Sequence, residues 1–277
     1  MSFRNTPSSE ADRVDLYNNS YGKLEERVLQ SVRRETDGED LGQSSWMTVD
    51  EYNRFFRLLE LEKTSHVLDI ACGSGYPSLY LAKTIGCGVI GIDINGNGIA
   101  AAKKKAKESN LDSKVDFKEV DAGRRLPFNN ESFDAAICVD SLIHLSDRLK
   151  VLKEWRRVLK PGGRLLFTDP TVITGLVSHI ELATRSSIGY FLFAPPGEDE
   201  RLIKKAGLRL LDHEDLTQNM AKVSKRWHDA RRGHKKELVK MEGHENFEGL
   251  QRFLLTVHSL ASERRLSRFL FVSEKIR

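Results

Sequence analysis

The chain has 277 residues, with 44 Lys and Arg against 40 Asp and Glu, so its formal net charge at pH 7 is only +4. This length suffices for one elaborated α/β domain whose core needs no disulfide or metal. A charge this small selects neither a nucleic-acid nor a membrane partner. Three cysteines in apolar surroundings, Cys72, Cys87 and Cys138, are typical of a reduced, cytoplasmic protein.

The signatures of exported, membrane-spanning and metal-binding chains do not occur in this sequence. Residues 1–15 have neither the apolar centre of a signal peptide nor the composition of a transit peptide. No apolar run reaches the roughly 18 residues of a membrane span. No Cys-x-x-Cys or His-x-x-x-His spacing predicts a metal site.

The N-terminal part is polar and rich in turns, and we expect a helix near 21–34. Thr48 and Glu51 have the spacing of a capping box. The helix that they begin places Tyr52 and Phe55 on one apolar face.

Short apolar runs then alternate with helical segments. Strands are predicted at 66–70, 88–92, 115–120, 133–139 and 164–168, and helices at 76–84, 100–108 and 147–159, the last with Ser146 as N-cap. This alternation is typical of right-handed β-α-β units, which form a parallel sheet covered by helices on both faces.

The alternation becomes less regular after Asp169. Residues 171–193 are apolar but interrupted by charges, so we expect a cap there and no strand. The later predicted elements are a helix at 198–206, a strand at 208–211, helices at 217–239 and 243–262, and a strand at 267–273. We therefore divide the chain into a lid segment (1–48), a cofactor-binding core (49–170), a cap insertion (171–196) and the rest of the sheet (197–277), which carries a helical insertion at about 214–265.

Acidic residues end the first three predicted strands, at the edge where parallel sheets bind ligands. Asp69 precedes a loop that contains Gly73 and Gly75, while Asp93 and Asp121 end the next two strands. The glycines allow a tight turn and a close approach of a ligand. We expect the three carboxylates to meet around one crevice.

A dinucleotide is the obvious competing ligand, because glycine-rich turns before helices hold phosphates. However, Ser78 replaces the third glycine of that fingerprint, and the Asp69 carboxylate would repel a pyrophosphate. That carboxylate suits a nucleoside with an ammonium and a sulfonium group, while Asp93 can accept from ribose hydroxyls and Asp121 from an adenine amino group. Each acid also has a simpler interpretation: Asp69 as a turn cap, Asp93 as the cap of a helix near Asn95, and Asp121 as a surface acid.

Five motifs in this order resemble those of class I S-adenosylmethionine-dependent methyltransferases. Residues 67–75 (Val-Leu-Asp-Ile-Ala-Cys-Gly-Ser-Gly) resemble their first motif, and Asp93 matches their ribose-binding acid. Asp121 and Ala122, followed by Leu-Pro-Phe, resemble the adenine motif, and residues 132–134 and 159–163 resemble the two later motifs. Ala71 replaces a glycine that is common in the family, which implies that this position needs no positive φ.

The resemblance implies S-adenosyl-L-methionine as the cofactor and a doubly wound, seven-stranded Rossmann-like sheet with helical cap insertions. The last strand, near 268–272, would be antiparallel. The expected cofactor site comprises Asp69, Ala71, Gly73, Gly75, Asp93, Ile94, Asp121, Ala122, Val139 and Asp140. The N-terminal segment is similar to the lid of phosphoethanolamine and sarcosine/dimethylglycine methyltransferases, which implies that Tyr17, Gln43 and Trp46 close the cofactor site.

The methyl acceptor is expected among the segments outside the core. His144 follows the fourth predicted strand and could be a general base or a pocket wall. Arg185 in the cap could hold a carboxylate or phosphate, or form a salt bridge within the cap. Tyr21 and His179 are further candidates for the acceptor site, and Tyr190 is a second candidate for catalysis.

These features predict an enzyme that methylates a small molecule at nitrogen or oxygen. Three alternatives stay open: C-methylation of a quinone or prenyl chain, suggested by apolar residues 188–193; methylation of RNA, suggested by basic residues 222–240; and cofactor binding without catalysis. Residues 139–142 lack the Asn/Asp-Pro-Pro-aromatic motif of many nucleic-acid amino methyltransferases, so we expect no nucleic-acid partner. The sequence leaves the oligomeric state open.

Overall fold

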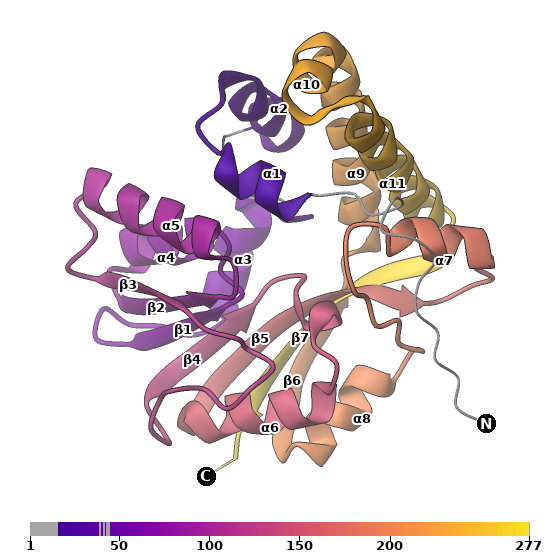
Figure 1. Ribbon diagram of the computed structural model, residues 1–277. Helices are drawn as coiled ribbons and strands as arrows, with labels where there is room; N and C mark the ends of the chain where they lie inside the picture. The colour runs from indigo at the N-terminus through magenta and orange to yellow at the C-terminus, as the bar shows by residue number, and fades with distance from the viewer. Residues whose placement is uncertain (1–15, 39, 41, 43–44, 277) are drawn as a thin grey trace.

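The computed structural model describes residues 16–38, 40, 42 and 45–276. A seven-stranded sheet with the order β3-β2-β1-β4-β5-β7-β6 forms its centre (Figure 1). The strands are β1 (His66–Ile70), β2 (Gly88–Asp93), β3 (Val115–Glu119), β4 (Phe133–Cys138), β5 (Leu159–Ile173), β6 (Leu208–Asp215) and β7 (Leu266–Lys275). Strands β1 to β5 pair in parallel, while β7 is antiparallel to both β5 and β6. The predicted sheet, including its antiparallel last strand, is confirmed.

Successive residues of the central strands face two separate hydrophobic layers. In β1, Val67 packs into one layer and Leu68 into the other, and Ala135 and Ala136 of β4 alternate in the same way. Helices α3 (Val49–Leu58), α4 (Tyr76–Ile85) and α5 (Gly96–Glu108) cover the first layer, and α6 (Arg148–Val158) and α8 (Glu198–Lys205) cover the second. Burial on both faces explains why these strands are apolar throughout, and it confirms the doubly wound architecture.

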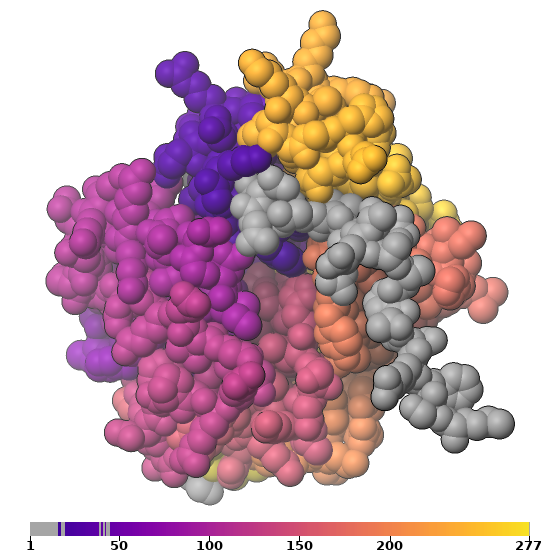
Figure 2. Space-filling view, in the orientation of Figure 1, coloured from indigo at the N-terminus to yellow at the C-terminus, as the bar shows by residue number. Residues whose placement is uncertain are grey.

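The remaining helices form a cap over the carboxyl ends of the strands. They are α1 (Tyr17–Gly22), α2 (Arg27–Asp37), α7 (His179–Arg185), α9 (Thr217–Gly233), α10 (Lys235–Glu242) and α11 (His244–Ser262). In the space-filling view, the N-terminal helices (indigo) and the C-terminal helices (yellow) lie side by side above the sheet layers (Figure 2).

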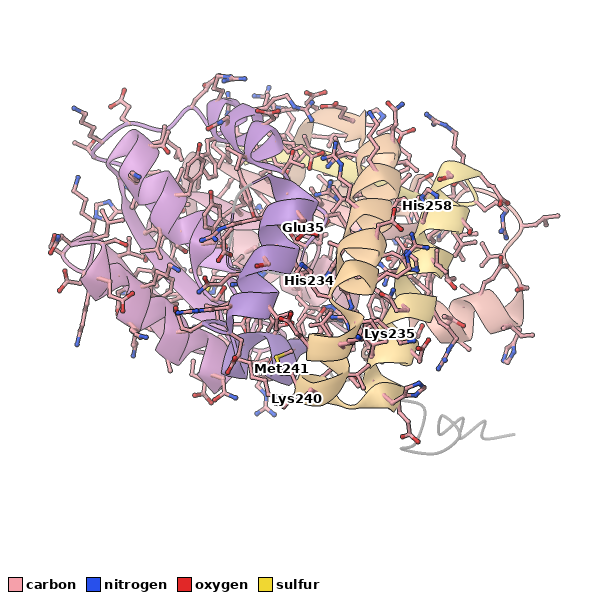
Figure 3. All side chains as sticks on the ribbon, turned by 90° about the horizontal axis from the view of Figure 1, so that it is seen from above. Glu35, His234, Lys235, Lys240, Met241 and His258 are labelled. Atoms are coloured by element: carbon pink, nitrogen blue, oxygen red, sulfur yellow. The ribbon has the colours of Figure 1, made fainter. Side chains whose placement is uncertain are left out.

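Helix α2 and the residues just before it contact the C-terminal helices of the cap through polar and apolar groups. The Nε2 atom of His234 lies 2.7 Å from Oε1 of Glu35, and Figure 3 shows these side chains facing each other between α2 and the C-terminal helices. Lys23 Nζ donates to the carbonyl oxygen of Met241 at 2.8 Å. An apolar cluster beneath these bonds contains Val28, Leu29, Val32, Ala230, Leu238 and Phe247. The N-terminal lid is therefore packed against the C-terminal insertion.

Several predicted boundaries are wrong. The single helix expected at 21–34 is two helices, α1 and α2, and the helix expected at 217–239 ends at Gly233. The N-cap of α6 is Asp147, whose carboxylate accepts from Lys150 N at 2.9 Å, and not Ser146. Strand β5 continues to Ile173, so the expectation of no strand in the segment from 171 is wrong there, and β6 continues to Asp215. Both extensions form because their residues pair with β7.

Two further properties concern the described residues alone. No helix within them combines the length and apolar character that a membrane span requires. They contain no group of three or more His, Cys, Asp or Glu side chains that could hold a metal ion.

Candidate active site

The loop after β1 is the centre of the candidate cofactor site, and its backbone turns sharply. Gly73 and Gly75 have φ values of 56° and 80°. A Cβ on Gly75 would lie 2.7 Å from Ala102 Cβ of α5, and a Cβ on Gly73 would collide with the Tyr21 hydroxyl of the lid. The expectation that Ala71 needs no positive φ is wrong, because its φ is 57°. A methyl side chain is small enough for this loop, although the left-handed conformation disfavours it.

Asp93 joins the end of β2 to this loop through hydrogen bonds. Its Oδ2 accepts from Gly73 N and its Oδ1 from Asn95 N, both at 2.8 Å. Burial raises the pKa of Asp93, and these backbone hydrogen bonds oppose the shift. The cap of α5 is Asn95, whose Oδ1 accepts from Gly98 N at 3.0 Å. Asp93 is therefore not the helix cap, and its remaining lone pairs are available to a ligand.

The other two acids differ in exposure. Asp121 accepts from Gly123 N at 2.8 Å and from Arg124 Nε at 3.0 Å, and its side chain is 39% exposed. Asp69 is buried and accepts from Ser78 Oγ at 2.6 Å. Burial raises the pKa of Asp69 to about 7, and the negative charge of Asp93 adds to this shift. Asp93 and Asp121 thus meet at one crevice as predicted, while Asp69 lies beneath the glycine loop.

The crevice has a volume of about 330 Å³, which falls within the roughly 300–1,000 Å³ of small-molecule sites. Its lining consists of Tyr17, Tyr21, Ala71, Asp93, Ile94, Asn95, Val120, Asp121, Ala122, Ser141, His144 and Leu145. Ile94 is 69% exposed, so a flat ligand group could cover it. Carboxylate acceptors, an exposed apolar side chain and a buried carboxyl group below the loop fit the ribose, the adenine and the cationic tail of S-adenosylmethionine.

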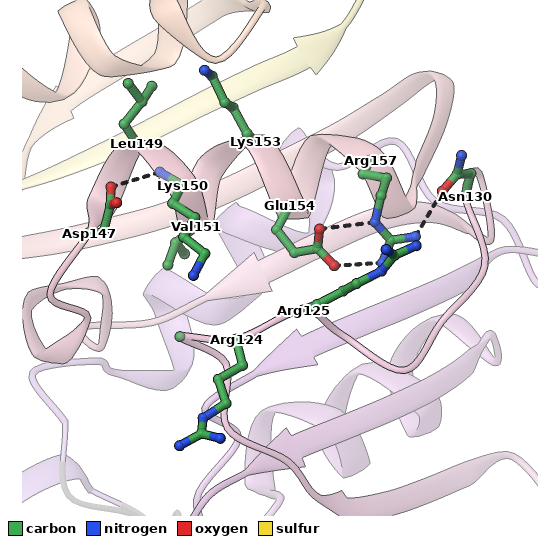
Figure 4. Close-up of a pocket in the computed structure, with 11 residues that line it drawn as sticks. Arg124, Arg125, Asn130, Asp147, Leu149, Lys150, Val151, Lys153, Glu154 and Arg157 are labelled. Atoms are coloured by element: carbon green, nitrogen blue, oxygen red, sulfur yellow. Dashed lines mark hydrogen bonds and ion pairs between the residues drawn. The ribbon is translucent and has the colours of Figure 1, made fainter.

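A larger hollow of about 590 Å³ lies outside this crevice, against α6. Its walls are mostly charged side chains, among them Arg124, Arg125 and Lys153 (Figure 4). Glu154 and Arg157 form an ion pair within it. It shares no lining residue with the crevice, so we assign the cofactor to the smaller cavity, where the motif residues lie.

Tyr17 and His144 form a hydrogen-bonded pair in the wall of the crevice. Tyr17 Oη lies 3.0 Å from His144 Nε2, and His144 Nδ1 lies 2.8 Å from the carbonyl oxygen of Tyr190. Because a carbonyl only accepts, Nδ1 carries the ring proton and the Tyr17 hydroxyl donates to Nε2. Burial raises the pKa of Tyr17 to about 12 and lowers the pKa of His144. Both groups are therefore neutral near pH 7.

Two other candidates lie farther from this pair. Tyr190 is 57% exposed, and the contact that it makes with His144 comes from its backbone carbonyl. His179 is exposed at the first position of α7. A side-chain role for either residue remains a prediction.

The end of β4 holds a buried network of charges. Asp140 Oδ1 accepts from Thr168 Oγ1 and from Arg268 Nε, both at 2.7 Å, and its Oδ2 accepts from Trp46 N at 3.1 Å. Arg268 Nη1 also donates to Glu51 at 3.0 Å. Glu51 therefore bonds Arg268 and does not complete the predicted capping box, although its backbone N–H does donate to Thr48 Oγ1. Asp140 contributes to this network, and not to the crevice wall.

The remaining predicted site residues that the structure describes lie either next to the sheet or in the cap. Val139 packs against the first hydrophobic layer, and its carbonyl accepts from Ser141 Oγ at 2.8 Å. Trp46 is buried in the cap, where its ring stacks on Phe253. Gln43 lies outside the described residues. Arg185 is buried beside Trp46, with its guanidinium carbon 5.9 Å from the centre of that ring.

Part of the basic charge of residues 222–240 is paired within the cap. Lys225 pairs with Asp229, Arg231 with Glu242 and Lys235 with Glu248. This pairing favours a structural role over contact with RNA.

Sequence reasoning missed several residues of the site. Asn95, Val120, Ser141 and Leu145 line the crevice because they directly follow or precede motif residues, and that proximity was a usable signal. Arg268 was missed because it meets Asp140 across 128 positions of sequence.

Known proteins share both the sequence motifs and this architecture. Residues 68–167 match the family described as a methyltransferase domain. The methyltransferase GfsG of Streptomyces halstedii is 33% identical over 178 residues, which cover 62% of this chain and 61% of that protein. The 27-O-demethylrifamycin SV methyltransferase of Amycolatopsis mediterranei is 31% identical over 193 residues, which cover 65% and 71%. The match thus spans less than two thirds of the GfsG protein.

A solved structure extends the likeness to nearly the whole chain. Phosphoethanolamine N-methyltransferase 2 of Haemonchus contortus, in complex with phosphomonomethylethanolamine and S-adenosylhomocysteine, has a TM-score of 0.79 at 20% identity. The superposition covers 95% of this chain and 61% of that one. The fold, including the cap, is therefore shared.

Proposed function

Because the chain belongs to the family of S-adenosylmethionine-dependent methyltransferases, we propose that it methylates a small-molecule acceptor at oxygen or nitrogen. S-adenosyl-L-methionine is the cofactor, as the sequence motifs predicted. The observation that carries the proposal is the neutral Tyr17–His144 pair in the wall of the crevice. The names of the two relatives and of the solved structure, which include an O- and an N-methyltransferase, support these acceptor atoms.

The residues that line the crevice would bind the polar groups of the cofactor. Asp93 would accept from the ribose hydroxyls and Asp121 from the adenine amino group, with Ile94 against the base. Asp69 beneath the glycine loop would supply negative charge to the methionine end. When bound, the cofactor supplies a methyl group on an activated leaving group, so correct placement of the acceptor provides much of the catalysis.

The Tyr17–His144 pair can remove the proton that the acceptor must lose. The acceptor O–H or N–H would donate to Tyr17 Oη, while the proton of Tyr17 moves to Nε2 of His144. The Nδ1–H of His144 stays on the carbonyl of Tyr190, which stabilises the resulting imidazolium. The proton that His144 takes up would balance the positive charge that the bound cofactor gives up together with its methyl group.

The proposal is tested with purified protein, heavy-methyl cofactor and a panel of hydroxyl- and amine-bearing metabolites, followed by mass spectrometry. We expect label in one chemical class of small molecule. Label found only in RNA or protein would refute the proposal, and a new C–CH₃ bond in a quinone or prenyl product would establish the C-methylation alternative. Cofactor binding without any turnover would indicate a non-catalytic protein.

The cellular setting is part of the proposal. Cys72, Cys87 and Cys138 are all free and buried, which supports a reduced, cytoplasmic environment. The internal pairing of the basic cap residues supports a small molecule over nucleic acid as the partner.

A further inference from the structure

Among the residues that the structure describes, one buried cation of the cap has no anionic partner. Four arginines are buried in the part of the chain that the structure describes, and three of them have carboxylate partners: Arg148 with Asp169 and Asp199, Arg231 with Glu242, and Arg268 with Asp140 and Glu51. Arg185 is 1% exposed, and its Nε and Nη1 atoms have no hydrogen-bond partner among the described residues. A buried guanidinium without an anion is costly, so its retention calls for an explanation.

Aromatic rings surround this guanidinium. Its central carbon lies 4.5 Å from the ring centre of Phe191, 5.2 Å from that of Phe253 and 5.9 Å from that of Trp46. Such rings attract a cation through their faces and partly compensate for its lost hydration. They accept no strong hydrogen bonds, so the N–H donors stay unsatisfied.

The nearest acids cannot satisfy Arg185, because other arginines already bind them. Asp140 and Asp169 both influence Arg185 electrostatically, but Asp140 pairs with Arg268 and Asp169 with Arg148. Burial lowers the pKa of Arg185 to about 10, so the side chain remains charged at neutral pH.

Arg185 lies beside the pair that we assign to proton removal. The Phe191 ring, which contacts the guanidinium, is also 4.8 Å from the His144 ring. Burial raises the pKa of Tyr17, and the positive charge of Arg185 opposes this shift. A single aromatic ring, Phe191, therefore contacts both the Arg185 cation and the His144 imidazole.

We propose that Arg185 binds a carboxylate or phosphate group of the methyl acceptor, so that the enzyme selects anionic small molecules. The inference rests on the proposed function. A carboxylate or phosphate has several oxygens, which match a guanidinium with several unsatisfied donors. Phe191 is only half-buried and contacts both groups, so it is the ring that an entering anion would displace. The cofactor also carries a carboxylate, and the experiment must separate these two sources.

The first measurement compares the wild type with Arg185→Met, which keeps the length of the side chain but removes its charge. With the protein saturated in S-adenosylhomocysteine, added inorganic phosphate should raise the melting temperature of the wild type and not that of Arg185→Met. Sodium chloride at the same ionic strength serves as the salt control. The control variant is Arg232→Met, whose side chain is 70% exposed on α9 and which should respond like the wild type.

The same variants separate a binding role from a structural one. Without ligands, Arg185→Met should melt at the same temperature as the wild type or higher, because it removes an unpaired buried charge. A lower melting temperature together with an unchanged response to phosphate would show that Arg185 only supports the aromatic cluster, and would overturn the proposal.

Calorimetry with S-adenosylhomocysteine distinguishes the source of the anion. An unchanged dissociation constant in Arg185→Met supports the acceptor as the source. A rise of about 10- to 100-fold, the range for a lost charge-assisted hydrogen bond, would assign Arg185 to the cofactor carboxylate and overturn the proposal.

The final measurement uses each acidic acceptor that the metabolite panel reveals, together with its neutral methyl ester. Arg185→Met should lower kcat/KM for the acid by about 10- to 100-fold, mainly through KM, and leave the ester unaffected. If acceptors are neutral and Arg185→Met methylates them as well as the wild type does, this inference fails while the proposed function stands. If neither protein methylates anything, the proposed function fails.

Discussion

The cofactor end of this molecule and the end where we propose that the acceptor binds are built in different ways. At the cofactor end, acids lie within or next to short sequence motifs, and backbone N–H groups hold Asp93 and Asp121 in place. At the acceptor end, Tyr17, His144 and Arg185 come from a lid helix, a turn after β4 and a cap helix. One end is fixed by local backbone geometry and the other by packing between distant segments.

This difference indicates which part of the molecule can change to accept a different substrate. A site made from backbone contacts within one motif tolerates little change, because each group depends on its neighbours in sequence. A site assembled from several cap segments can change one wall while the sheet stays intact. The cap of this chain should therefore determine which molecule is methylated, and the sheet edge should determine that the donor is S-adenosylmethionine.

The largest effect that we expect comes from breaking the buried charge network at the end of β4. Arg268→Met would leave Asp140 and Glu51 as buried carboxylates without their cation, and should lower the free energy of unfolding by about 3–5 kcal/mol. Urea denaturation measures this change. Arg209→Met, which removes a paired but 60% exposed arginine, should change stability by less than about 0.5 kcal/mol. Equal effects of the two variants would contradict a stabilising role of the buried network.

The second effect concerns catalysis at the acceptor end. His144→Gln removes the proton acceptor of the Tyr17 hydroxyl and should lower kcat by about 10²-fold or more, with little change in cofactor affinity. Steady-state kinetics and cofactor calorimetry measure the two quantities. His244→Gln is the matched control, because that imidazole is 69% exposed at the first position of α11. Tyr190→Phe should also retain activity, since the bond to His144 comes from the backbone; a loss there would assign a role to the Tyr190 hydroxyl.

Sequence reasoning predicted the cofactor end better than the acceptor end for the same physical reason. The motifs placed Asp93 and Gly73 at the same edge of the sheet, and the hydrogen bond between them, which was not predicted, joins neighbouring loops of that edge. The Tyr17–His144 contact spans 127 positions and depends on how the lid packs against the sheet. The pattern around His144 indicated only that it follows a strand.

The strained backbone at Ala71 was also not predicted from the sequence. Alanine at position 71 indicated an ordinary φ, whereas the turn of the loop imposes 57° on it. Helix breaks at Lys23 and His234 were also missed, because apolar periodicity continues across each break while the chain changes direction to close the cap.

The third effect tests the cofactor end. Asp93→Asn keeps the size of the side chain but loses its charge and cannot accept from Gly73 N and Asn95 N with both side-chain atoms. Cofactor affinity should fall by about 10- to 100-fold, because hydrogen bonds to charged groups contribute roughly 1.5–3 kcal/mol. Calorimetry with S-adenosylhomocysteine measures the loss. Asp116→Asn on β3, with a 60% exposed side chain, is the control. An unchanged affinity in Asp93→Asn would remove this acid from the site.

The last effect concerns Asp69, and it depends on pH. Its pKa in the folded protein is about 7 against an ordinary value of 3.8, so ionisation of this buried carboxyl opposes folding. The penalty is absent below pH 3.8, grows as the pH rises, and is complete above about 7. Asp69→Asn should therefore be more stable than the wild type above pH 7, and the difference should disappear in acid.

Binding of the cationic cofactor should show the opposite dependence, because the ionised carboxylate attracts it. Below pH 7, the affinity of the wild type for S-adenosylmethionine should weaken by at most about tenfold per pH unit, since the carboxylate must first lose its proton. Calorimetry between pH 5.5 and 8.5 measures the slope, with Asp69→Asn as the reference whose affinity should be weaker and flat. A slope shared by both proteins would show that another group titrates, and the negative charge beneath the glycine loop would then have no part in recognising the sulfonium.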